Sequence, residues 1–174
     1  MVLGMSLSTF TALHVLISLI GIGSGVVVVY GFLRAKKLNG ITAIFLSSTA
    51  LTSLTGFLFP VQHLMPSHIV GILSLVVLAI AAIARYPQRM QRSWRWIYVA
   101  GAMAGFYFNT FVLVAQSFMK VPALHALAPT QKEPPFAVAQ LGVLALFIVL
   151  GYFAVKRFQL EPSIVPSQRS RQAA

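Results

Sequence analysis

The feature that most constrains this chain is a series of five apolar stretches, each long enough to cross a bilayer. A transmembrane helix needs about 20 such residues to span ~30 Å of hydrocarbon. Hydrophobic residues make up 58% of the 174 positions and charged residues only 9%, so a soluble fold cannot bury the apolar surface. The sequence therefore predicts an all-α integral membrane bundle. Its spans are expected at residues 7–33, 41–59, 67–84, 96–119 and 135–155.

These spans define one transmembrane domain over residues 1–159, followed by a polar tail over residues 160–174 that is expected to be disordered and cytoplasmic. The second span is the least apolar, because it carries six hydroxyl side chains. Such hydroxyls bond to their own helix or to a neighbour, which suits a helix packed among others. They are Ser47, Ser48, Thr49, Thr52, Ser53 and Thr55.

The basic residues predict the orientation. With five spans, 11 of the 13 Lys and Arg residues fall on one side of the membrane, and only Lys120 and Lys132 fall on the other. Cytoplasmic segments carry the excess of positive charge. The N-terminus is therefore expected outside the cell and the C-terminus in the cytoplasm. The 11 residues are Arg34, Lys36, Lys37, Arg85, Arg89, Arg92, Arg95, Lys156, Arg157, Arg169 and Arg171.

The net charge of +11 has the same explanation. Because the positive residues lie in short segments between apolar runs, they indicate topology and attraction to anionic lipid and not binding of nucleic acid. The expected partners are the lipid bilayer and either a second copy of the chain or a larger membrane complex.

Small and polar residues form a stripe on the first span with spacings of three and four, so they share one helix face. The stripe consists of Thr11, His14, Ser18, Gly21 and Gly25. The pair Gly21 and Gly25 is typical of closely packed membrane helices. We expect leucine at either glycine to destabilise the protein much more than a replacement of Val28.

The fourth span repeats this pattern. Gly101 and Gly105 form a second small pair, and Asn109 and Gln116 continue roughly the same face. Amides are costly in hydrocarbon unless they are bonded, so both should point toward neighbouring helices.

All four histidines fall at the outer side under this topology, namely His14, His63, His68 and His125. Neutral imidazole is a common ligand of copper, zinc and iron, and two imidazoles on facing helices can bind haem. A single imidazole can hydrogen-bond a quinone. The alternative is that the histidines are structural or interfacial.

We predict that one polar pocket lies below the outer surface, roofed by residues 120–135. Its lining is expected to be His14, His68, Gln116 and Gln140, each within two to three turns of the outer end of its span. The absence of any intramembrane carboxylate favours a neutral or softly bound ligand over a hard cation.

Catalytic residues are missing from the pattern. The only acids are Glu133 and Glu161, both outside the spans, and the chain contains neither aspartate nor cysteine. Paired-carboxylate chemistry, a Ser-His-Asp triad and an ion-coupled relay within the membrane are therefore not expected. The composition argues against an enzyme.

Four segments resemble small multi-pass bacterial inner-membrane proteins with no assigned activity. They are FNTFVLVAQSFMKVP at residues 108–122, LAPTQKEPPF at 127–136, TGFLFP at 55–60 and PSHIVG at 66–71. The resemblance implies an inner-membrane location and no reaction. Two hypotheses follow: an accessory or structural protein with a polar pocket, or a redox protein that binds metal, haem or quinone.

Overall fold

The computed structural model describes residues 2–60 and 66–158, and the regular elements in these two ranges are all helices. The helix at the second predicted span begins two residues and ends three residues earlier than expected, and the other four long helices lie within two residues of the predicted bounds. The helices are α1 (Leu7–Leu33), α2 (Asn39–Gly56), α3 (Pro66–Arg85), α4 (Trp94–Lys120), α5 (Pro122–Leu127) and α6 (Pro134–Arg157).

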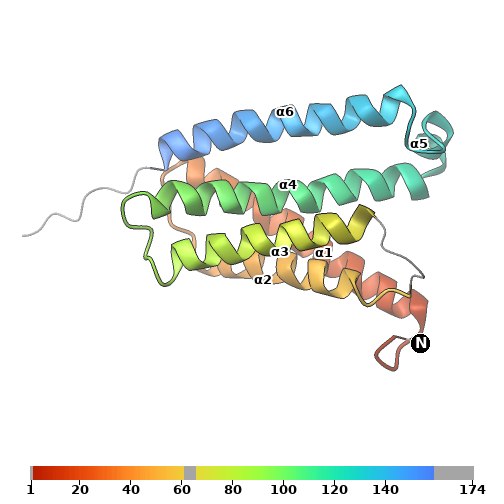
Figure 1. Ribbon diagram of the computed structural model, residues 1–174, viewed down its shortest axis with the longest axis horizontal. Coiled ribbons are helices and arrows are strands. Elements are labelled where there is room, and N and C mark those ends of the chain that lie inside the picture. The colour runs from red at the N-terminus through yellow and green to blue at the C-terminus, as the bar shows by residue number, and fades with distance from the viewer. Residues whose placement is uncertain (1, 61–65, 159–174) are drawn as a thin grey trace, which may run out of the picture.

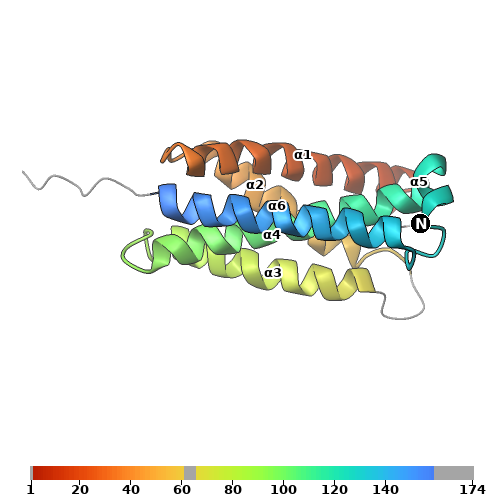
Figure 2. The ribbon, with the colours of Figure 1, turned by 90° about the horizontal axis from the view of Figure 1, so that it is seen from above.

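The five long helices lie side by side and alternate in direction (Figures 1 and 2). Helix α4 is central and contacts α1, α2, α3 and α6, while α6 also packs on α1. We call the end of the bundle that holds the start of α1 the N end. The C end is the opposite one, with the α1–α2 turn, the α3–α4 turn and the end of α6 (Figure 1).

The helix ends follow from local sequence. Helix α1 begins after Ser6, whose side-chain oxygen accepts a hydrogen bond from the Thr9 backbone N at 3.1 Å, as an N-cap does. Prolines occupy the first turns of α5 and α6, where the missing N–H costs nothing. Helix α5 was not predicted, because six residues are too few to show a hydrophobic period.

Four helices in the described ranges, α1, α3, α4 and α6, are long and apolar enough to cross a membrane. This is the helix content of a multi-pass membrane protein. Helix α2 falls short because of its hydroxyl side chains, of which five donate to carbonyl oxygens one turn earlier in α2 itself. These donors are Ser47, Ser48, Thr52, Ser53 and Thr55.

The glycine pairs lie at helix contacts, as predicted. A Cβ atom built on Gly25 would come within 2.8 Å of the Phe106 ring on α4. At Gly105 the equivalent atom would lie 2.6 Å from the Leu78 side chain on α3. Gly21 and Gly101 are similarly close to neighbouring helices.

Val28 is itself buried, so it is not a suitable exposed control for the two glycines. Its side chain is only 3% exposed and belongs to the main hydrophobic cluster. The lipid-facing position on this turn of α1 is Val26, which is 57% exposed. The two residues are 200° apart on a helical wheel, so the stripe of small residues predicted the packed face but not its full width.

The C end is tightly packed around aromatic rings. Phe32, Tyr98 and Phe158 lie with ring centroids 5.0–6.1 Å apart, and all three are at most 2% exposed. Arg85 joins them, although the sequence pattern placed it in a cytoplasmic turn. It is 6% exposed, and its guanidinium donates to Tyr98 Oη at 2.9 Å and to Asn39 Oδ1 at 2.7 Å.

Candidate functional site

A cavity of about 580 Å³ lies between α1, α2, α3 and α4 in the N-end half of the bundle. Ligand-binding pockets in proteins usually measure about 300–1,000 Å³. The predicted stripe on α1 divides here by position along the helix. Thr11, His14 and Ser18 line the cavity, whereas Gly21 and Gly25, one and two turns deeper, lie in close contact with neighbouring helices.

His14 is the most clearly oriented polar group of this cavity. Its Nδ1 lies 2.7 Å from Thr55 Oγ1 on α2. Thr55 Oγ1 also lies 2.7 Å from Leu51 O, and with its single proton donated there the imidazole Nδ1–H is the donor to Thr55. In the neutral ring Nε2 then carries a lone pair, which leaves it able to accept a hydrogen bond or to bind a metal.

His68 lines the same cavity from α3. Its side chain is 7% exposed, and its ring lies 5.5 Å from that of Phe57. The structure therefore brings the two predicted histidines of the first and third spans to one site, on helices that run in the same direction (Figure 1).

The floor of the cavity is a polar contact between α1 and α4. Ser18 Oγ donates to Asn109 Oδ1 at 2.9 Å, and both residues line the cavity. Just beneath them, a Cβ on Gly21 would lie 2.9 Å from Asn109 Nδ2 and 3.0 Å from Thr49 Oγ1. The lack of a side chain at Gly21 therefore makes room for these polar groups between the helices.

Ser74 is a cavity residue that the sequence analysis missed. It is 3% exposed, and its hydroxyl has no hydrogen-bond partner among the described residues. An unpaired buried hydroxyl costs about 1–3 kcal/mol, and this one lines a space large enough for another molecule. The available signal was that Ser74 is the one polar residue in the apolar run of residues 69–84.

Only one of the two glutamines predicted to line the cavity does so. Gln116 lines the cavity from α4. Gln140 does not, because α6 packs on α4 away from the cavity. Its amide Nε2 donates to Phe111 O on α4 at 3.1 Å, so it joins two helices and is not at the site.

The predicted roof of the cavity, residues 120–135, does not cover it in the structure. Of residues 120–135, only Lys120 and Val121 line the cavity. Gln131 Nε2 donates to Ala115 O at 2.7 Å, and Phe136 packs its ring on Phe118 at 5.4 Å. This connection is thus fastened to α4 and does not cover the site.

The predicted metal ligands do not assemble in the described part of the chain. His125 is an exposed residue of α5 and does not line the cavity, and His63 lies outside the described residues. Within those residues, no three His, Cys, Asp or Glu side chains are grouped as a metal ion requires. His14 and His68 are the two that share a site.

The fold and site define a multi-pass helical membrane protein with a polar cavity near one end. Comparisons of the chain with known protein families, with curated proteins and with solved structures find no match. The cavity is therefore the feature of this chain that bears on its function.

Proposed function

We propose that this protein binds a small, uncharged amphipathic molecule in the N-end cavity and acts as an accessory subunit of the bacterial inner membrane, without catalysis of its own. The observation that carries the proposal is a cavity lined by Ser74, whose buried hydroxyl has no partner, and by His14, whose ring is held through Nδ1. Ser74 supplies a hydroxyl without a partner, and His14 supplies the Nε2 lone pair. Gln116 adds an amide.

A quinone or quinol head group matches this set. A ring carbonyl accepts a hydrogen bond from Ser74 or Gln116, and a quinol hydroxyl donates to Nε2 of His14. No carboxylate lines the cavity, which disfavours a hard cation. Several other polar residues also line the cavity, but most of its surface is apolar, as suits an amphipathic ligand.

Binding of a short-chain ubiquinone to the purified protein tests the proposal. We expect Ser74→Ala and His14→Ala each to weaken binding about five- to tenfold, the effect of losing one hydrogen bond. His125→Ala and Ser47→Ala are the matched controls, because both side chains lie outside the cavity. Equal affinity of all four variants would refute the site.

The proposal includes a topology in which all five long helices cross the membrane, with the N-terminus outside. Helices α1 and α3 run in the same direction (Figure 1), so α2 returns between them. Its outward face is mainly apolar, with Ile44, Leu51 and Leu54 each more than 45% exposed, while five of its hydroxyl groups donate within α2. These two features support a membrane-crossing α2.

Reporter fusions test this topology. A fluorescent protein that matures only in the cytoplasm should be bright when fused after residue 174, and alkaline phosphatase at the same position should be inactive. Fusions after residue 60 should give the opposite pair of results. Three long helices, α3, α4 and α6, separate residue 60 from the C-terminus in either case, so a further fusion after residue 37 tests α2 itself and should report the cytoplasm. If α2 does not cross, the fusions after residues 37 and 60 will report the same side.

Haem is a second candidate ligand, because His14 and His68 line one cavity from two helices. The Nδ1–H of His14 is held by Thr55, the arrangement that directs Nε2 toward iron. Haem binding would produce an absorbance spectrum that His14→Ala abolishes and His125→Ala preserves. An unchanged spectrum after addition of haem to the purified protein would leave the quinone-type ligand.

A further inference from the structure

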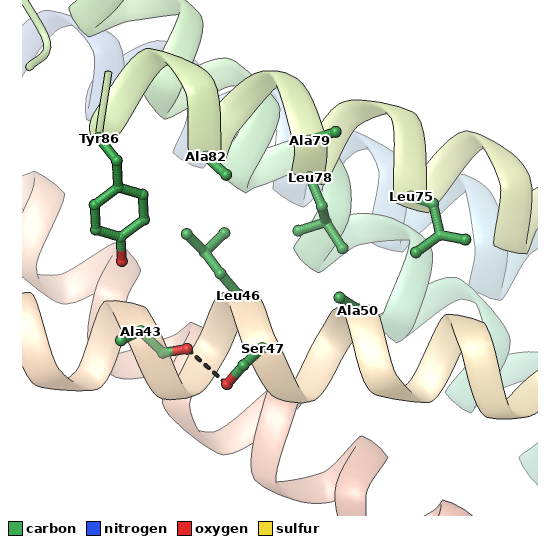
Figure 3. A pocket seen from close by; sticks show the side chains of 9 residues that line it. All are labelled: Ala43, Leu46, Ser47, Ala50, Leu75, Leu78, Ala79, Ala82 and Tyr86. Carbon is green, nitrogen blue, oxygen red and sulfur yellow. Dashed lines mark hydrogen bonds between the residues drawn. The ribbon is translucent and has the colours of Figure 1, made fainter. Parts of the chain in front are cut away.

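A second hollow lies on the outer surface of the bundle, between α2 and α3 toward the C end. It measures about 470 Å³. Figure 3 shows small side chains along both walls, with Ala43 and Ala50 on α2 facing Ala79 and Ala82 on α3. This groove is separate from the N-end cavity, and the two share no lining residue.

The groove is open to the surroundings of the bundle and has a closed floor. Leu46 and Leu78, which rise between the two helices (Figure 3), are only 8% and 4% exposed. Ser47 on the wall donates its proton to Ala43 O at 2.8 Å. The walls therefore present no polar group that needs a partner, and they suit an apolar occupant.

The length of the groove corresponds to one leaflet. On α3 it extends from Leu75 to Tyr86, which is 11 residues or ~16 Å at 1.5 Å per residue. Half of the ~30 Å hydrocarbon core is ~15 Å. An acyl chain of the leaflet at the C end therefore matches the groove along its whole length, whereas a transmembrane helix would extend well beyond it.

Basic residues lie close in sequence to the C end of the groove on both of its helices. Lys36 and Lys37 are exposed just before α2, and Arg89 is exposed three residues after Tyr86. The turn with Arg89 is fixed to the end of α3, because the backbone N atoms of Gln88 and Met90 donate to Ile83 O and Ala84 O. The only acid of the described ranges, Glu133, begins α6 at the N end.

Tyr86 connects the apolar and the basic part. Its ring closes the C end of the groove and reaches from α3 toward α2 (Figure 3). The side chain is 53% exposed, and tyrosine at such a depth favours the boundary between hydrocarbon and head groups. The order along the groove is thus apolar, then amphipathic, then positively charged.

We propose that this groove binds an anionic phospholipid of the leaflet at the C end. One acyl chain lies between α2 and α3, the Tyr86 hydroxyl lies at the ester groups, and Lys37 and Arg89 hold the phosphate. Charge selects this occupant over a second copy of the chain, because a copy would bring the same basic end against this one. The acyl chain determines where the lipid lies but adds little affinity, because lipid tails contact every other outer face of the bundle as well.

Native mass spectrometry of the delipidated protein tests the proposal, with dioleoyl phosphatidylglycerol and dioleoyl phosphatidylcholine as probes. We expect one phosphatidylglycerol to bind at least tenfold more tightly than phosphatidylcholine. The double variant Lys37→Gln, Arg89→Gln should lose about 25-fold in affinity for phosphatidylglycerol, at about fivefold per charge. Lys132→Gln is the control, because this basic residue lies in the α5–α6 connection at the N end, and it should leave the affinity for phosphatidylglycerol unchanged.

The groove itself is tested by filling it. Ala79→Leu and Ala43→Leu place a larger side chain in the groove from either wall, and each should weaken binding of both lipids at least fivefold. Val76→Leu, on the lipid-facing side of α3 outside the groove, is the control, and unchanged melting temperatures verify that the variants fold.

Three results would overturn the proposal. The first is equal affinity for the two lipids, and the second is unchanged binding after both groove-filling substitutions. The third is a dimer of the delipidated protein that Ala79→Leu dissociates, which would identify a second copy as the occupant.

Discussion

Helices α1 to α4 run through both ends of the bundle, and the two ends differ in how the space between the helices is filled. At the C end, Phe32, Tyr98 and Phe158 pack ring against ring, and Arg85 donates hydrogen bonds into this cluster. At the N end, the same helices enclose about 580 Å³.

The difference teaches how a small membrane protein can combine rigidity with a site. The hydrophobic effect does not drive helix association inside a bilayer, so packing contacts and interhelical hydrogen bonds must hold the helices together. This chain concentrates those contacts at the C end and near Gly21 and Gly25. The N-end half is then held open without separating the helices.

The largest expected effect is at Arg85. Arg85→Ala leaves Tyr98 Oη and Asn39 Oδ1 without their donor and removes a buried side chain, so the free energy of unfolding should fall by about 3–5 kcal/mol. Denaturation in mixed micelles measures it. Arg89→Ala, at an exposed position, should have almost no effect. Similar losses for both variants would mean that the C end is not the stable half.

The next effect is at the close approach of α1 and α4. Gly25→Leu forces its side chain into the Phe106 ring, and overpacking of this kind costs about 1–3 kcal/mol. Val26→Leu, on the adjacent lipid-facing position, should cost less than about 0.5 kcal/mol. Equal stability of the two variants would show that α1 and α4 can move apart freely.

One substitution made at both ends sharpens the comparison directly. Val99→Phe enlarges a fully buried side chain at the C end and should cost about 1–3 kcal/mol. Val112→Phe, 13 residues further along α4, enters the cavity and should change stability by less than about 1 kcal/mol. Thermal unfolding in detergent compares them, and equal losses would contradict an open N end.

The smallest effects concern two serines of the cavity, which should have opposite signs. Ser18→Ala removes the donor to Asn109 and should lower the free energy of unfolding by about 1 kcal/mol. Ser74→Ala removes a hydroxyl without a partner and should leave stability unchanged or raise it by up to about 1 kcal/mol. A loss at Ser74 equal to that at Ser18 would show that its hydroxyl is bonded in the empty protein.

Much of the fold was accessible from the sequence because uninterrupted apolar runs and border prolines specify membrane-length helices. The 3–4 spacing on α1 also identified the face that carries both the cavity residues and the contact glycines. These signals are local, so they do not depend on knowing which helices are neighbours.

The rest depended on the arrangement of helices in space. Gln140 is at the same depth as Gln116, but its helix lies on the other side of α4. Arg85 follows an apolar run as a flanking charge does, and only the positions of Tyr98 and Asn39 reveal that it is buried. Ser74 has no special spacing, and its importance comes from the cavity beside it.

The turn between α1 and α2 has a consequence for how the chain enters the membrane. Residues 34–38 are all that separate the two helices, and antiparallel helices joined so closely form a hairpin. Helix α2 is not apolar enough to be recognised as a span by itself, yet a hairpin partner that emerges from the ribosome first can shield its hydroxylated face. If α2 crosses the membrane as proposed above, its insertion is coupled to that of α1, and a longer linker between them should lower the yield of correctly inserted protein.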